Sequence, residues 1–188
     1  MKLLQDEFMD SSKIFSTFDT WIDRVGNAIS WCTVLMVLTT CLVVILRYGF
    51  GTGSVFLQET VIYMHSLVIM FGLAYTLKHD GHVRVDLLYN SQTPRNQAWT
   101  NLFGHLFLLL PFSLILVTES LGITASIPLE RSYVGRSWSV FEGSAEVGGL
   151  PGIFLLKSLI PISGGLLAMQ AIGETFKTIR YIRNSDWK

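Results

Sequence analysis

Charged residues are scarce in this chain, and its longest apolar segment has none. Only 15% of the 188 residues are charged, while half are hydrophobic. The 19-residue segment 28–46 (AISWCTVLMVLTTCLVVIL) carries no charge and ends at Arg47. A helix of this length covers about 28 Å, which matches the hydrocarbon core of a bilayer. The composition therefore excludes an ordinary soluble domain and predicts an integral membrane protein.

Cysteine is equally scarce, since Cys32 and Cys41 are the two cysteines and both fall in this segment. They are nine positions apart on a helix, so they lie on different faces and too far apart for an internal disulfide. The sequence also lacks an internal repeat, a low-complexity tract and a glycine-rich nucleotide-binding loop. We expect no nucleic-acid partner and no cofactor.

Three more apolar segments of spanning length follow, at 61–77, 102–117 and 153–172. Proline and glycine inside them are tolerated in spanning helices. The spans account for about 72 residues, which leaves little chain for a separate soluble domain. We therefore expect a single membrane domain over residues 1–188, all-α, with four transmembrane helices.

The segments outside the spans are amphipathic. Residues 1–27 place apolar side chains at helical spacing on one face and polar ones on the other, which predicts an interfacial N-terminal helix. Further stretches of this kind begin at Val83, which Pro94 limits, and near Trp138. These interfacial helices would widen the bundle in the membrane plane.

The net charge of zero hides an asymmetry between the loops. Ten of the 14 basic residues lie before the first span, between the second and third, or after the fourth. Arg47, Arg131 and Arg136 lie in the opposite loops, and Lys157 lies inside a span. The positive-inside rule then predicts that both termini are cytoplasmic and that loop 118–152 is external. The first apolar run is too long and its flank too acidic for a cleaved signal peptide.

Ionisable side chains are nearly absent from the middle of the spans, where an ion-coupled transporter usually carries them. Glu59 stands just before the second span, where we weigh capping of the helix against contact with a partner. Lys157 lies in the fourth span, where we weigh an ammonium that reaches the external surface against an ion pair with another helix or subunit. Gly164 and Ala168 form a small-xxx-small pair that serves either internal or subunit packing.

The densest polar motif is KHDGHVRVD, residues 78–86, at the end of the second span. Metal binding by its histidines and aspartates is opposed by the neighbouring Lys78 and Arg84, and no cysteine contributes. We favour a solvated or partner-facing charge network, in which Arg84 and Asp86 orient the exit of the helix.

These residues resemble a known family. His82, Arg84 and Asp86 close the second span, Arg47 and Tyr48 close the first, and Glu59 opens the second, as in the small membrane subunit (DctQ type) of TRAP, or tripartite ATP-independent periplasmic, transporters. Segment 142–161 resembles one branch of that family, and the similarity covers roughly residues 20–175. Gln58 and Thr93 depart from the usual pattern.

The resemblance implies a bacterial inner-membrane, sodium-coupled uptake system for an organic acid. In it, a periplasmic solute-binding protein captures the carboxylate and a large membrane subunit carries it. This chain would brace the large subunit, with no catalytic, cofactor or metal site. The residues expected at the partner interface or orienting the chain in the bilayer are Arg47, Glu59, His82, Arg84, Asp86 and Lys157.

Two alternatives come from other classes. In a four-helix membrane cytochrome b, His65 and His105 would ligate haem, but helical rise puts them at depths that differ by about 8 Å. A self-sufficient homodimeric transporter would need a carboxylate within a span, and none is present.

Overall fold

The computed structural model describes the backbone of residues 2–79, 81, 89, 91–123, 128 and 131–184, and side chains from residue 17 to 183 within these ranges. The described part contains α1 (Lys2–Gly49), α2 (Val55–Lys78), α4 (Pro94–Phe103), η1 (Gly104–Leu109), α5 (Leu110–Ser120), α6 (Tyr133–Ser139) and α7 (Ile153–Asn184), and no strand. Four stretches of the described helices are long and apolar enough to cross a membrane: Thr17–Gly49, Val55–Lys78, Pro94–Ser120 and Ile153–Arg183. The predicted all-α architecture with four spanning helices is confirmed.

Each helix runs beyond its predicted apolar span. The clearest difference is at α1, which continues without a break through the boundary expected between residues 27 and 28. The N-terminal segment is therefore not a separate helix. Its backbone hydrogen bonds continue because helical geometry depends on φ and ψ, whereas hydropathy only marks which part of a helix is apolar. Placement of this segment in the membrane interface stays a prediction.

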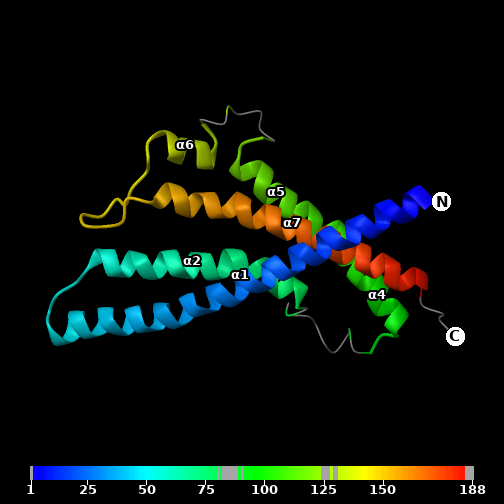
Figure 1. Cartoon of the computed structure of the whole chain (residues 1–188). Helices are drawn as coiled ribbons and strands as arrows, with labels where there is room; N and C mark the ends of the chain where they lie inside the picture. The colour runs from blue at the N-terminus through cyan, green and yellow to red at the C-terminus, as the bar shows by residue number, and fades with distance from the viewer. Residues whose placement is uncertain are drawn as a thin grey trace.

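Helices α1 and α2 form a hairpin, in which α2 lies beside the C-terminal part of α1 (Figure 1). The half-buried residues in the apolar part of α1, residues 28–46, recur at alternating spacings of three and four, which is the pattern of a coiled-coil seam. They are Ile29, Cys32, Met36, Thr39, Val43 and Leu46. Cys32 and Cys41 are free thiols, as expected from their separation.

Gly26 allows the closest approach within this hairpin. A Cβ atom built at this position would lie 2.7 Å from both Cγ and Cε2 of Tyr75, a separation that real Cβ atoms do not show. Any larger residue at this position would therefore push α1 away from α2.

The third span combines α4, η1 and α5 into one continuous helix with a π-helical segment. Pro111 has no N–H, so it cannot donate to the carbonyl of the residue four positions earlier. The chain widens just before this proline, and the Leu110 N–H donates to the His105 carbonyl five residues back. The π-helix thus accommodates the proline without a break in the span.

Helix α7 is the central element, because it packs against α2, α4, α5 and α6. Leu167 and Ala171 on α7 are buried, and together with Leu77 they form the described apolar core. A Cβ built at Gly164 would lie 3.1 Å from the Ser113 carbonyl oxygen and 3.0 Å from a Val117 methyl. Gly164 therefore serves internal packing of α7 on α5.

Candidate functional sites at the two ends of the bundle

Polar contacts between distant parts of the chain gather at two places, one at each end of the bundle. The first is at the end that carries α6 and the loop between α1 and α2. The second is at the opposite end, where α1 crosses α7 (Figure 1).

Glu59 of α2 holds the loop that precedes α7. Its Oε2 accepts a 2.5 Å hydrogen bond from the Leu150 N–H, and its Oε1 accepts one from the Ser144 hydroxyl. Gly149 is required beside it, because a Cβ there would lie 2.7 Å from Glu59 Oε1. Ser54, not Glu59, is the N-cap of α2, since its side chain accepts from the Leu57 N–H. Of the two alternatives for Glu59, capping of this helix is contradicted, and contact with a partner stays a prediction.

Lys157 of α7 fixes the start of the same loop. Its Nζ lies 2.5 Å from Glu142 Oε2 and 4.7 Å from the centre of the Tyr133 ring. The lysine side chain is 20% exposed, so its charge is largely removed from solvent and is compensated within the chain. Lys157 therefore forms an ion pair rather than reaching the surface alone, and the partner is a loop of this chain. We call Glu59, Glu142, Ser144, Leu150 and Lys157 the loop anchor.

The ion pair alters the acidity of Glu142. The hydrogen bond from Lys157 is the largest of the influences that hold the pKa of Glu142 below its usual value of 4.5, and the positive charges of Lys157 and Arg136 act in the same direction. Glu142 is therefore ionised over the physiological pH range, and the loop anchor carries a carboxylate facing an ammonium.

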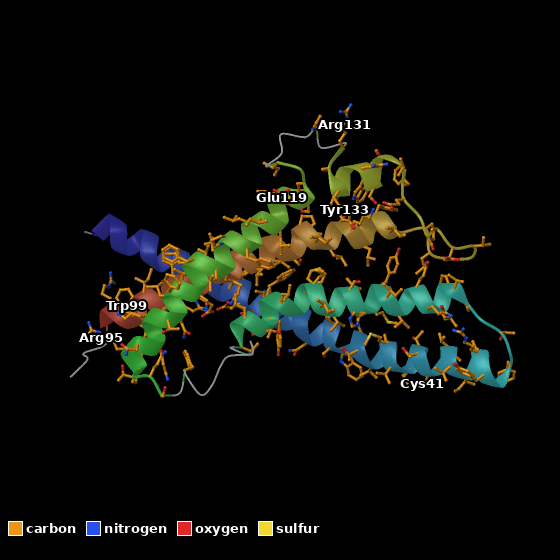
Figure 2. All side chains as sticks on the ribbon, turned by 180° about the vertical axis from the view of Figure 1, so that it is seen from behind. Cys41, Arg95, Trp99, Glu119, Arg131 and Tyr133 are labelled. Atoms are coloured by element: carbon orange, nitrogen blue, oxygen red, sulfur yellow. The ribbon has the colours of Figure 1, made fainter. Side chains whose placement is uncertain are left out.

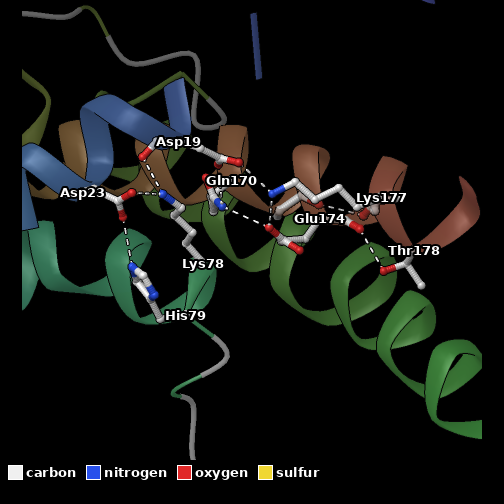
Figure 3. A network of polar contacts seen from close by, with 10 residues as sticks. Asp19, Asp23, Lys78, His79, Gln170, Glu174, Lys177 and Thr178 are labelled. Atoms are coloured by element: carbon white, nitrogen blue, oxygen red, sulfur yellow. Dashed lines mark hydrogen bonds and ion pairs between the residues drawn. The ribbon is translucent and has the colours of Figure 1, made fainter. Parts of the chain in front are cut away.

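The second set of contacts joins α1, α2 and α7 (Figure 3). Lys78, the last residue of α2, donates 2.7 Å to the Asp19 carbonyl and also binds the Asp23 carboxylate. His79 Nε2 lies 2.9 Å from the other oxygen of Asp23. A single turn of α1 therefore holds the end of α2 through one lysine and one histidine.

The same turn of α1 also contacts α7. Asp19 Oδ2 accepts a 2.8 Å bond from Lys177, and Asp19 Oδ1 accepts a 3.3 Å bond from Gln170. Glu174 lies between them and accepts from Gln170 at 3.2 Å and from Lys177 at 2.8 Å. We call Asp19, Asp23, Lys78, His79, Gln170, Glu174 and Lys177 the polar clamp. It connects three of the four spanning helices at one level.

The remaining predicted site residues are distributed unevenly. Arg47 lies exposed in the last turn of α1, where its charge complements the carbonyl end of the helix. His82, Arg84 and Asp86 lie outside the described residues. Of the six predicted residues, the structure thus brings Glu59 and Lys157 into one site.

The sequence motif at residues 78–86 includes Lys78 and His79 of the polar clamp, but sequence reasoning missed their partners on α1 and the residues of α7. Asp19 and Asp23 fit the solvated face of an interfacial helix, and Lys177 counted only as a basic residue. The signal that was available is positional: Asp19 and Asp23 are four residues apart, and Gln170, Glu174 and Lys177 follow at spacings of four and three. Each set therefore lies on one face of its helix.

The described residues contain no group of three or more His, Cys, Asp or Glu side chains placed to hold a metal ion. His65 is exposed on α2, whereas His105 lies in η1 with a buried Nδ1.

Between the two polar sets, the helices present wide apolar surfaces. Among the described residues, the apolar part of α1 packs mainly along α2, and Trp31 is 69% exposed and Leu38 is 61% exposed. The third span exposes Phe107 and Leu108 in the same way. Figure 2 places Glu119, Arg131 and Tyr133 at the α6 end, and Arg95 and Trp99 at the other. Such apolar faces suit lipid or the helices of another membrane subunit.

The fold and the two polar sites define a multi-pass membrane protein whose ionisable side chains cluster at the ends of its bundle. The comparison with known families is specific: residues 36–181 match the family described as tripartite ATP-independent periplasmic transporters, DctQ component. The chain belongs to this family, a small membrane component of a transporter. No curated protein matches the chain. Membership in a transporter family gives no support to the cytochrome interpretation.

Proposed function

We propose that this chain is the small permease subunit that braces the large membrane subunit during sodium-coupled, binding-protein-dependent uptake of an organic acid. The family match supports a transporter component. The carboxylate substrate, the sodium coupling and the periplasmic binding protein follow from the resemblance between this sequence and the family. The large subunit would carry the substrate and ion sites.

The observation that carries the bracing role is the separation of polar and apolar surfaces. The polar clamp and the loop anchor connect segments of this chain to one another at the two ends of the bundle. Among the described residues, the apolar part of α1 between them packs along α2 and is otherwise largely exposed. A bundle fixed at both ends, with a long free apolar face, is suited to support a neighbouring subunit in the membrane plane.

The proposed orientation places the polar clamp at the cytoplasmic face of the bacterial inner membrane and the loop anchor at the periplasmic face. Both termini would then be cytoplasmic, as the distribution of basic residues indicates. In this orientation the loop anchor would shape the surface nearest to an incoming binding protein. Reaction of single cysteines, introduced at Arg131 and Arg95, with a membrane-impermeant reagent tests it. Labelling at Arg131 only, in intact spheroplasts, is the expected result.

Purification in mild detergent tests the bracing role directly. The expected result is recovery of a much larger multi-pass subunit in near-equal amount, identified by mass spectrometry. Reconstitution in vesicles supplies the functional measurement: uptake of a carboxylate should require this chain, the large subunit, the binding protein and a sodium gradient. Uptake by this chain alone would refute the proposal.

A matched pair of variants locates the face that supports the large subunit. Leu38→Trp enlarges the free face of α1, and Leu108→Trp enlarges the free face of the third span; both residues are more than 60% exposed. We expect Leu38→Trp to reduce recovery of the large subunit and Leu108→Trp to leave it unchanged, because α1 has the longer free face. Full recovery with Leu38→Trp would contradict the assignment to α1.

A further inference from the structure

Gln170 is an unusual residue for its position. It lies in the last apolar part of α7 and is 1% exposed, between the buried Leu167 and Ala171. A buried amide destabilises a fold unless its polar atoms find partners. Its hydrogen bonds therefore indicate what the amide does at this place.

Those hydrogen bonds connect two helices that are otherwise far apart in sequence. The Gln170 amide donates to Asp19 of α1, 151 residues away, and to Glu174 of its own helix. The second oxygen of Asp19 accepts from Lys177. A single carboxylate of α1 therefore contacts two residues on one face of α7, Gln170 and Lys177, and Glu174 between them bonds both (Figure 3).

Helix α2 holds α1 at the turn that carries Asp19 and Asp23. It ends at Lys78, whose ammonium binds Asp23 and the Asp19 carbonyl. The segment of α1 that precedes Asp19 extends past the end of α2 and crosses α7 (Figure 1). The contacts of the Asp19 side chain thus fix the point on α7 where this segment crosses.

Neighbouring crossing points are disfavoured on both sides. A shift of one helical turn, about 5.4 Å, towards the middle of α7 would place the Asp19 carboxylate against Leu166 and Leu167, which offer no hydrogen-bond donor. A shift of one turn in the other direction would place it against the Glu174 carboxylate, and like charges at this distance repel. Apolar side chains alone discriminate poorly between such positions, whereas a buried polar contact selects one.

We propose that Gln170 and Asp19 form a register lock, which selects the turn of α7 on which the N-terminal part of α1 crosses. Gln170 is a positioning residue in this device, because it acts through Asp19. The lock sets the direction of the free apolar face of α1. This consequence rests on the proposed bracing function, whereas the lock itself depends only on the isolated chain.

The test measures distances between spin labels in the full chain, purified and placed in lipid nanodiscs. The native cysteines are removed by Cys32→Ser and Cys41→Ser. Labels at Arg24 on α1 and Ile179 on α7, both exposed, report the register. The unmodified sequence should give one narrow distance distribution.

Gln170→Leu introduces an apolar side chain of similar size in place of the amide and removes both hydrogen bonds. We expect the distribution to broaden or to gain a second maximum displaced by about 5 Å, which is one helical turn. Asp19→Ala removes the hydrogen-bond partner of Gln170 and changes a less buried residue. It should alter the distance distribution in the same way, so the proposal can still be tested if Gln170→Leu folds poorly. The double variant should be no broader than either single variant.

Ser163→Ala is the matched control. Ser163 is as buried as Gln170 and lies two turns away on α7, but its hydroxyl contacts only the Ile160 carbonyl and the Met70 sulphur. It should leave the distribution unchanged. An unchanged single maximum in both Gln170→Leu and Asp19→Ala would overturn the register lock. A broadened distance distribution with undiminished recovery of the large subunit would support the register lock but contradict its link to the bracing function.

Discussion

Replacing Gly26 with alanine tests the packing of α1 on α2. The added methyl would overlap the Tyr75 ring, with 2.7 Å to two of its carbon atoms. Overpacking of this kind costs about 1–3 kcal/mol. The substitution also replaces a glycine inside a helix with alanine, and this change by itself stabilises the helix by about 1 kcal/mol. The two effects have opposite signs, so a control with only the second effect is needed.

Gly165→Ala is that control. Gly165 is also in a spanning helix, but no atom lies within 4 Å of a Cβ built there. The change in helix propensity is common to both variants, so their difference isolates the overlap at Gly26. We expect Gly26→Ala to be less stable than Gly165→Ala by about 1–3 kcal/mol. For a chain of this size that corresponds to a difference of about 2–12 °C in Tm.

The assay is thermal unfolding of the purified chain in one detergent, followed by tryptophan fluorescence. A second comparison is made in a Tyr75→Ala background, where the ring is absent. Gly26→Ala should then raise Tm as Gly165→Ala does, because nothing is left to overlap. Equal Tm values for Gly26→Ala and Gly165→Ala in the unmodified background would refute the assignment of Gly26 as the point of closest approach.

Three further predictions concern the two polar sites. Glu59→Gln leaves one acceptor oxygen where the loop requires two, so the loop should lose one hydrogen bond. A hydrogen bond to a charged acceptor contributes about 1.5–3 kcal/mol, so hydrogen exchange at residues 144–150 should accelerate. The pKa of Glu142 in the folded chain lies below 4.5, so its ion pair with Lys157 stabilises the fold above that pH and is lost as the pH falls through the lowered pKa. The native chain should therefore have a higher Tm than Glu142→Gln at neutral pH, and this difference should disappear on acidification. Asp23→Ala leaves the Lys78 ammonium without its carboxylate, which should lower Tm.

Each of these has a control or a contradicting outcome. Glu119→Gln changes the same functional group at the exposed end of α5 and should not alter exchange in the loop. A pH-independent difference between the native chain and Glu142→Gln would contradict the ionisation of that carboxyl. Arg24→Ala removes an exposed charge beside Asp23 and should leave Tm unchanged; an equal loss in both variants would argue against the polar clamp.

The four spans were predictable because the helices of a soluble domain seldom contain uncharged runs long enough to cross a bilayer. The helix ends were not, since α1 and α7 continue as helices through polar residues that hydropathy does not assign to a span. The turn of α1 at Asp19 is helical whether its polar face meets water or a partner helix. Periodicity alone cannot distinguish these two environments.

The site residues were likewise only partly predictable from the sequence. Glu59 and Lys157 stood out because isolated charges near apolar segments are costly, and both proved to be paired. Their partners were not predictable, since Ser144 and Leu150 contribute a hydroxyl and a backbone N–H in a loop with no regular pattern. Gln170 gave the weaker signal of a neutral amide, and its partner Asp19 lies 151 residues earlier in the chain.

The long separations within the polar contacts have a consequence for how the protein is made. Glu59 can form its hydrogen bond to Leu150 only after the chain has grown by 91 residues, and Asp19 can form its hydrogen bond to Gln170 only after it has grown by 151 residues. At a synthesis rate of about 5–20 residues per second, Gln170 leaves the ribosome roughly 8–30 s after Asp19. The α1–α2 hairpin must therefore persist in the bilayer, held mainly by its own apolar seam, until the last helix arrives. During that interval the carboxylates of Asp19 and Glu59 lack their final partners, so this is the stage at which a membrane insertase or a protease would most readily distinguish the unfinished chain from the completed one.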